Sequence, residues 1–353
     1  MNFKNQTFIK ELSVAKGELA LKVTDLHFRK NPIKDKNKRE LEKKKYRGDV
    51  ITHFNYLIEA LQINSPEMYY HFLEWRLNLL DADNNSKEDL LNNIKNITEV
   101  ISGQFSKGEA DIALSFLESG GDHIKGLKPE RESFLDSDQP FSIEAKQYLE
   151  LLLKGKRDQA SQLIDQLVEQ GTAVVDIYEY IFQASQYEVG VLWQRNEITV
   201  AHEHYCTAAT QLIMSRLYPK IFSGKKNGLK LIACSVASEL HEIGIRMVSD
   251  FFEMDGWDTY YMGSNLPEEH LIQSLREHDA NLLAISVTLP IHINRVESII
   301  RNIRKQPEFK DLKIMTGGYP FGVIPGLTEK VGADATAVNA RLAIVKANEI
   351  VSN

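Results

Sequence analysis

Two short segments in the second half of the chain combine histidine, carboxylate and aromatic side chains, which are the residue types that bind metal ions and flat organic ligands. These segments read Trp193-Gln-Arg-Asn-Glu-Ile-Thr-Val200-Ala-His-Glu203-His204 and Glu239-Leu-His241-Glu-Ile-Gly244. In the first segment, a large flat aromatic side chain beside a carboxylate and an imidazole suits a nucleoside. The second segment is weaker evidence when taken alone, because a single histidine in a loop between a strand and a helix is more often a helix cap or a solvent contact than a metal ligand.

The pair formed by His202 and His204 raises the question of a zinc site. Residues two positions apart on a helix do not face one another, so a shared zinc ion is disfavoured and His202 is expected at the surface. The two cysteines, Cys206 and Cys234, stand in unrelated contexts, and neither is assigned a role. The sequence therefore predicts no disulfide framework, which fits a reducing cytoplasm.

Composition excludes some classes of function. The 353 residues carry a formal net charge of -7, which argues against broad nucleic-acid binding. The densest basic run, residues 29–45, also contains acidic residues and is interpreted as a solvated linker or helix face. Because the sequence contains neither an apolar stretch of about 18 residues nor a signal peptide, we expect a cytoplasmic protein without a membrane span.

The segment from residue 226 to 353 alternates short apolar runs with amphipathic stretches. The apolar runs expected to form strands are residues 229–237, 259–263, 282–288, 313–318 and 335–338. The stretches expected to form helices between them are residues 241–254, 267–277, 291–306 and 339–352. This alternation predicts a doubly wound parallel sheet, and ligands of such sheets bind at the carboxyl ends of the strands.

The rest of the chain is predicted to be helical and to form two domains. Residues 142–222 show four helical stretches with short joints, which predicts a four-helix bundle. In the N-terminal domain, residues 1–135, helices are expected over residues 49–61, 65–80 and 87–101, with a short helix over 111–117. A linker, residues 136–142, is expected between these two helical domains.

The hexapeptide that ends in Gly244 resembles the Asp-x-His-x-x-Gly signature of cobalamin-binding domains of the methionine synthase type. The resemblance implies that His241 ligates cobalt from below and that an acidic residue holds its other ring nitrogen. Glu239 stands where the family usually has Asp, which leaves the tuning of the ligand more open than the ligation itself. The matching small residues of the family's strand ends are Gly263, Ser286, Thr288, Gly317 and Gly318. The implied domain is a flavodoxin-like, Rossmann-like cobalamin-binding domain over residues 226–353.

The segment from Trp193 to His204 resembles the Trp-x9-Glu-His motif of adenosylcobalamin-dependent light-sensing repressors, in which a helical bundle covers the upper face of the cofactor. The resemblance implies that Trp193 caps the adenosyl group, that Val200 packs against it and that Glu203 contacts the adenosine. It further implies that His204 ligates cobalt from above after light breaks the carbon–cobalt bond. The alternative is that Trp193 is a core residue at a helix end.

The N-terminal domain lacks the winged helix-turn-helix of those repressors and loosely resembles the helical region of photocobilins, which bind cobalamin and a linear tetrapyrrole such as biliverdin. The aromatic and histidine side chains that could line a bilin site are His53, Tyr56, Tyr70, His71 and Trp75. Because no cysteine lies in this domain, a bilin would have no thioether link to it. The alternative is that these side chains form the core and rim of the helical domain.

These observations favour an adenosylcobalamin-binding photoreceptor or signalling protein, not an enzyme, whose output passes through a homo-oligomer or a protein partner. The main alternative is a corrinoid methyl carrier of a methyltransferase system, which would not require Trp193 or the Glu203-His204 pair. A sensor that uses cobalamin only as a ligand is a third possibility. An isomerase is disfavoured because the chain has no barrel domain for a substrate.

Overall fold

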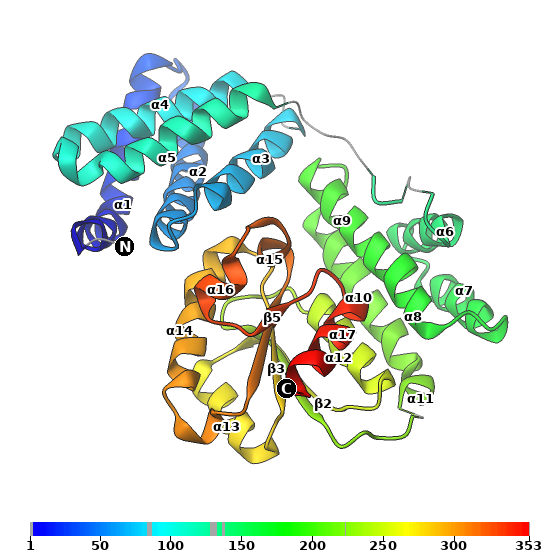
Figure 1. Cartoon of the computed structure of the whole chain (residues 1–353). Helices are drawn as coiled ribbons and strands as arrows, with labels where there is room; N and C mark the ends of the chain where they lie inside the picture. Colours follow the sequence, from blue (N-terminus) through cyan, green and yellow to red (C-terminus); the bar gives the residue numbers. More distant parts are fainter. Residues whose placement is uncertain (1–2, 83–86, 128–132, 136–137, 223, 353) are drawn as a thin grey trace. The chain divides into compact units, whose positions relative to one another are not determined.

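The computed structural model describes residues 3–82, 87–127, 133–135, 138–222 and 224–352. The chain divides into two compact units, residues 1–130 and residues 131–353 (Figure 1). The first unit is helical, and the second combines helices with a parallel sheet. No helix within the described ranges is long and apolar enough to span a bilayer.

In its described ranges the first unit consists of five helices, which confirms the expectation of an all-helical segment. They are α1 (Phe3–Lys30), α2 (Lys36–Gln62), α3 (Pro66–Ala82), α4 (Lys87–Gln104) and α5 (Lys107–Gly126). The prediction of a short helix over residues 111–117 was wrong in length, because α5 has 20 residues. Gly120 permits close packing inside the helix, because a Cβ there would lie 2.6 Å from the ring of Tyr69.

The second unit begins with the helical bundle. Its helices are α6 (Ser142–Leu153), α7 (Arg157–Glu169), α8 (Val174–Asp176), the π-helix η1 (Ile177–Gln183), α9 (Ala184–Gln194), α10 (Val200–Arg216) and α11 (Tyr218–Ile221). Gly155 and Gly171 follow α6 and α7 with φ of 71° and 90°, the left-handed conformation in which glycine ends a helix without strain. In the expected linker, Asp136 and Ser137 lie outside the described residues, and α6 begins at Ser142.

Five parallel strands form the sheet, in the order β2-β1-β3-β4-β5. They are β1 (Lys230–Val236), β2 (Asp258–Leu266), β3 (Leu282–Ser286), β4 (Lys313–Gly317) and β5 (Ala335–Thr336). The helices between and after them are α12 (Ile243–Met254), α13 (Glu268–His278), α14 (Ile293–Arg304), α15 (Tyr319–Val323), α16 (Leu327–Val331) and α17 (Ala340–Val351), with 3-10 turns η2 (Pro290–His292) and η3 (Pro307–Phe309). The predicted doubly wound fold is therefore confirmed, although β2 is longer and β5 shorter than expected, and α15 and α16 were not predicted.

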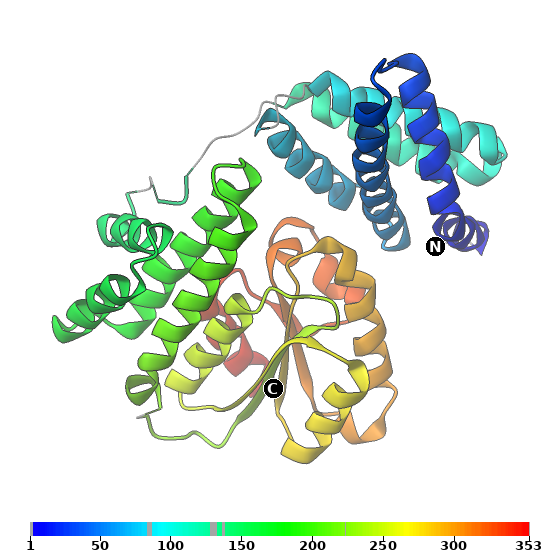
Figure 2. The ribbon, with the colours of Figure 1, turned by 180° about the vertical axis from the view of Figure 1, so that it is seen from behind.

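Helices cover both faces of the sheet (Figures 1 and 2). One face packs against α12 and α17 in a core that includes Phe252 and Trp257. The other face is covered by α13 and α14 (Figure 2). Both faces are therefore apolar, which explains why the strands read as continuous hydrophobic runs.

The bundle and the sheet are joined through α12. Met247 and Phe251 of this helix belong to the hydrophobic core of the bundle. The hydroxyl of Tyr178 in η1 donates a hydrogen bond of 2.8 Å to Oδ2 of the buried Asp250. Shared core packing and a buried hydrogen bond together fix the sheet against the bundle.

The segment that precedes the bundle is held on α9. Glu188, which is buried, accepts hydrogen bonds from Oγ of Ser133 at 2.9 Å and from the backbone nitrogen of Phe134 at 2.8 Å. Leu135 joins the core of the bundle. The chain therefore enters the second unit along the same helix that carries Trp193.

Asp250 gives the joint between bundle and sheet a pH dependence. Burial raises the pKa of its carboxyl from 3.8 to about 6, although the hydrogen bond from Tyr178 and the charge of Arg246 oppose the rise. Between these values the folded protein binds more protons than the unfolded chain, so ionisation of Asp250 costs stability as the pH rises from about 4 to 6. We expect Asp250→Asn, which keeps an oxygen acceptor for Tyr178, to be about 1–3 kcal/mol more stable than the parent protein at pH 7.

Denaturant unfolding of both proteins between pH 4 and pH 7 measures this effect, and the gain should shrink toward pH 4. Asp255→Asn, which alters an exposed carboxylate at the end of the same helix, is the matched control. A gain that is the same at every pH would show that Asp250 does not titrate as proposed.

Candidate functional site

His241 lies in the loop between β1 and α12, at the carboxyl edge of the sheet. Its Nδ1 lies 2.5 Å from Oε1 of Glu239, and its side chain is 55% exposed. The carboxylate holds a proton on Nδ1, so the lone pair of the ring is on Nε2. The geometry thus prepares Nε2 as the nitrogen that can bind a metal.

Glu239 is a fully buried carboxylate that only accepts hydrogen bonds. Besides Nδ1 of His241, its donors are the backbone nitrogens of His241 at 3.1 Å, Thr288 at 2.9 Å and Leu289 at 2.9 Å. Burial alone would raise its pKa, but the hydrogen bonds from His241 and Leu289 lower it to about 2. The hydrogen bond from His241 to Glu239 in turn raises the pKa of the imidazole, against the effect of burial.

These contacts show what Glu239 does at the position where the resembled family usually has aspartate. Its carboxylate reaches the imidazole with one oxygen and the loop after β3 with the other. The longer side chain therefore holds the ring and ties two loops together. Thr288 takes part through its backbone nitrogen.

Asn265 belongs to this site, although no motif in the sequence singled it out. Its Oδ1 accepts a hydrogen bond of 2.8 Å from the backbone nitrogen of Ser238, and the backbone nitrogen of Asn265 donates to the carbonyl of Glu239 at 2.9 Å. Both Ser238 and Asn265 have positive φ, at 71° and 55°. The only sequence signal was a residue type that tolerates this conformation at the end of a strand.

Side chains become smaller toward the carboxyl edge of the sheet. Leu231 and Leu282 are paired in register, then Ala233 and Ala284, and finally Ser235 and Ser286. Ser286 is in turn paired with Gly317 of β4. On this face of the two strands the residues nearest the loop of His241 are therefore small, and Oγ of the buried Ser235 donates a hydrogen bond of 3.1 Å to the His241 carbonyl.

The positions of Gly263, Gly318 and Gly244 differ in whether they require glycine. Gly318 has φ of 99°, and a Cβ there would lie 2.0 Å from the carbonyl oxygen of Val287, so only glycine fits between the loops after β3 and β4. Gly263 also has positive φ, at 77°. Gly244 lies within α12, and nothing is within 4 Å of an added Cβ.

The residues expected above the cofactor lie at the facing ends of α9 and α10. Trp193 is 40% exposed and Val200 is 53% exposed, so neither is a core residue. Oε2 of Glu203 lies 2.5 Å from Nδ1 of His204, whose side chain is 75% exposed. The charge of Glu203 contributes to the raised pKa of His241. The Glu203 carboxylate therefore lies within electrostatic reach of the loop after β1.

A second link joins α10 to this loop. Gln211 donates a hydrogen bond of 2.7 Å to Oε1 of Glu242, and Ser264 donates one of 3.1 Å to Oε2. Glu242 follows His241 directly in the chain and so connects the bundle to β2. His202 is exposed, and its Nδ1 contacts the Thr199 hydroxyl at 2.8 Å as part of the cap of α10.

The residues considered for a bilin pack against other side chains of the first unit. His53 is buried in hydrogen-bonding contact with Tyr69, and burial lowers its pKa to about 3. Tyr56 stacks on Phe72, with ring centroids 4.3 Å apart, and the ring of Trp75 lies 6.1 Å from that of Phe72. These contacts favour the interpretation of this group as core.

The remaining two side chains of that group also have partners within the unit. Tyr70 stacks on His123, with ring centroids 4.6 Å apart. His71 and His123 both contact the carboxylate of Glu74, at 3.1 and 2.7 Å. All five residues are thus engaged in contacts within the helical unit, without a bilin.

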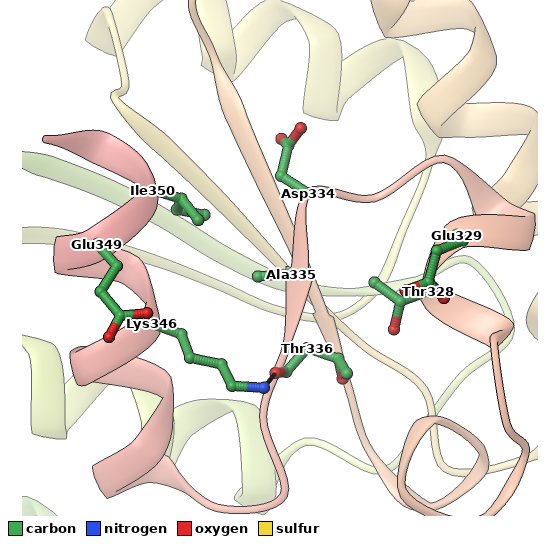
Figure 3. A pocket seen from close by; sticks show the side chains of 8 residues that line it. All are labelled: Thr328, Glu329, Asp334, Ala335, Thr336, Lys346, Glu349 and Ile350. Carbon is green, nitrogen blue, oxygen red and sulfur yellow. Dashed lines mark hydrogen bonds between the residues drawn. The ribbon is translucent and has the colours of Figure 1, made fainter. Parts of the chain in front are cut away.

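One pocket in the described part of the chain opens along the free edge of β5. It lies between α16 and α17, and Nζ of Lys346 donates to the carbonyl of Thr336 at 2.6 Å across it (Figure 3). In the strand order, β5 is separated from β1 by β3 and β4. None of the residues expected to bind cobalamin lines this pocket.

The steric requirement at Gly318 can be tested without any ligand. We expect Gly318→Ala to lower the free energy of unfolding by about 2–4 kcal/mol, because the methyl group requires a strained φ and displaces the Val287 backbone. Gly317→Ala is the matched control, since its nearest contact would be an ordinary 3.9 Å. Equal unfolding midpoints in urea for the two variants would contradict this account of Gly318.

Known proteins with sequence similarity to this chain match its second unit. Two protein-family models, each described as a B12 binding domain, match residues 144–218 and 229–345. The dimethylamine corrinoid protein of Methanosarcina barkeri is 27% identical over 180 residues, which cover 50% of this chain and 83% of that protein. The dimethylamine corrinoid protein 1 of Methanosarcina mazei is 24% identical over 204 residues, or 57% of this chain and 93% of that protein.

A solved structure shares the fold. The monomethylamine corrinoid protein of Methanosarcina barkeri superposes with a TM-score of 0.54 at 21% identity and covers 60% of this chain and 99% of that one. These relatives support the cobalamin-binding part of the expected resemblance, and their names are those of corrinoid proteins and not of photoreceptors. Both family-model matches fall in the second unit, which is therefore similar to B12 binding domains over residues 144–218 and 229–345.

Proposed function

We propose that this chain is a corrinoid carrier protein of a methyltransferase system, with Nε2 of His241 as the lower ligand of cobalt. The observation that carries the proposal is the pair formed by Glu239 and His241, in which a buried carboxylate fixes the tautomer of an exposed imidazole. The names of the relatives, which are corrinoid proteins of methylamine systems, support methyl transfer over the photoreceptor function.

The residues around His241 fit a corrinoid. Ser235, Ser286 and Gly317 form a row of small residues in register, and small residues are what a nucleotide tail close to the strand backbone would require. Gly318 lets the neighbouring loops approach closely. When bound, the corrinoid supplies a cobalt ion that can carry a methyl group; the chain binds it, orients it and provides the lower nitrogen.

A carrier also needs partners that load and remove the methyl group. The second unit consists of a helical bundle and a cobalamin-type sheet domain, so we infer that a separate methyltransferase subunit provides the substrate site. The exposed loops at the carboxyl edge of the sheet, where Leu240 is 71% exposed, are the surface that such a subunit would cover.

One observation favours a second function, that of an adenosylcobalamin-dependent light sensor. Trp193 and Val200 are large apolar side chains left exposed beside the Glu203–His204 pair. A methyl group needs no such surface, whereas an adenosyl group would cover it. Biliverdin has no corresponding support, because the side chains considered for it contact other side chains of the first unit.

The role of the Glu239–His241 pair can be tested by substitution. We expect His241→Ala to abolish the absorption signature of histidine ligation in protein loaded with hydroxocobalamin. Glu239→Gln should keep ligation but weaken the binding of hydroxocobalamin about 10–100-fold, because the NH2 group of the glutamine would face N–H donors. His270→Ala, which removes an exposed imidazole on α13, is the control, and an unchanged spectrum in His241→Ala would refute the assignment.

Binding of two corrinoids in the dark, followed by illumination, separates the two functions. A carrier should bind methylcobalamin at least as tightly as adenosylcobalamin and should not change its assembly in light. A light sensor should prefer adenosylcobalamin by about tenfold or more, which corresponds to 1.4 kcal/mol, and should change its assembly on illumination. Failure to bind either compound would overturn both functions.

A further inference from the structure

A line of hydrogen-bonding side chains crosses the bundle from its core to the end that carries Glu203. The hydroxyl of Tyr148 lies 3.0 Å from Oγ1 of Thr210, and the amide of Gln186 lies between Thr210 at 3.0 Å and Thr207 at 3.2 Å. Oγ1 of Thr207 is also 3.0 Å from Oε1 of Glu203. Tyr148 and Thr210 are fully buried, so the line connects the interior of the bundle to its surface.

Proton counting restricts how these groups can bond. A threonine hydroxyl has one hydrogen, so Thr207 cannot donate both to Glu203 and to an oxygen of Gln186. A half turn of the Gln186 amide removes this competition, because its nitrogen then donates to Thr207 while its oxygen accepts from Thr210. Each hydroxyl then has one acceptor, and every hydrogen bond in the line points from Tyr148 toward Glu203.

The geometry of α10 explains why Glu203 needs such support. Adjacent residues on a helix point in different directions, so contact between Glu203 and His204 is not a default of the helix. Thr207, one turn further on, fixes Oε1 of Glu203, which leaves Oε2 to contact Nδ1 of His204 at 2.5 Å. The proton of the neutral ring is then held on Nδ1.

We propose that Gln186 and Thr207 are positioning residues that fix Glu203, and through it the His204 ring, at the upper face of the corrinoid. This inference rests on the proposed binding of a corrinoid through His241 and adds the expectation that the start of α10 covers its upper face. Neither residue is among those expected to bind the cofactor. They would orient the two groups that the light-sensing alternative places above cobalt.

The first test uses protein without cofactor. In protein labelled with ¹⁵N-histidine at a pH where His204 is neutral, the ring nitrogen shifts should report a proton on Nδ1. Thr207→Val, which removes the hydroxyl at nearly constant shape, should move His204 toward a mixture of tautomers, and Thr207→Ser should restore the parent shifts. Thr98→Val, which removes a hydroxyl from α4 that contacts the Ile94 carbonyl, is the matched control.

The second test uses loaded protein. Loss of one hydrogen bond that orients Glu203 should change the ratio of dissociation constants for adenosylcobalamin and methylcobalamin by about fivefold in Thr207→Val. Gln186→Met should act in the same direction. The absorption signature of His241 ligation should remain unchanged in both variants.

The outcomes separate this inference from the proposed function. Parent-like His204 shifts in Thr207→Val would overturn the positioning role even when cobalamin binds through His241. Altered shifts in a protein that binds no corrinoid would support the hydrogen-bonded line and remove the proposed function. Equal changes in Thr207→Val and Thr207→Ser would show a packing effect and would also overturn the inference.

Discussion

The buried carboxylate of Glu239 is the interaction on which the site depends. An ionised group taken out of water costs several kcal/mol unless its hydrogen-bonding capacity is filled. Four N–H groups fill it, and they come from the His241 ring and from the backbones of two loops. Because the charge requires these donors, it fixes the loops after β1 and β3 and the tautomer of His241 together.

A second carboxylate–imidazole pair lies on the bundle, and the two pairs differ in burial. Glu239 is inaccessible, whereas both Glu203 and His204 are reached by solvent. A buried carboxylate whose hydrogen bonds are filled holds one arrangement, while an exposed pair depends on a supporting contact such as that of Thr207 with Glu203. This difference suits a corrinoid protein, whose lower ligand must persist while its upper ligand is exchanged.

The first unit is organised around its own core and not around the cobalamin domains. The contact between His53 and Tyr69 is enclosed by aromatic packing, and Gly120 permits α5 to approach that cluster closely. Burial keeps the imidazole of His53 neutral at physiological pH, as its lowered pKa indicates. The chain then enters the bundle along α9, where the buried Glu188 holds the backbone of Phe134.

The sequence by itself determined the parallel sheet, the helical character of the rest and the position of His241 in a strand-to-helix loop. These features follow from periodicity and spacing within a few residues, which a single sequence displays. It did not reveal that Gly120 lies inside a helix, because the role of this glycine depends on the distant ring of Tyr69.

The tertiary structure alone decided how Glu239 is satisfied, since Leu289 is 50 residues away along the chain. It also decided that Gln186 lies beside Thr207, on a different helix. Contacts of this kind join side chains through the packing of whole elements. They leave no periodic pattern in the sequence, and only the folded chain places their atoms within hydrogen-bonding distance.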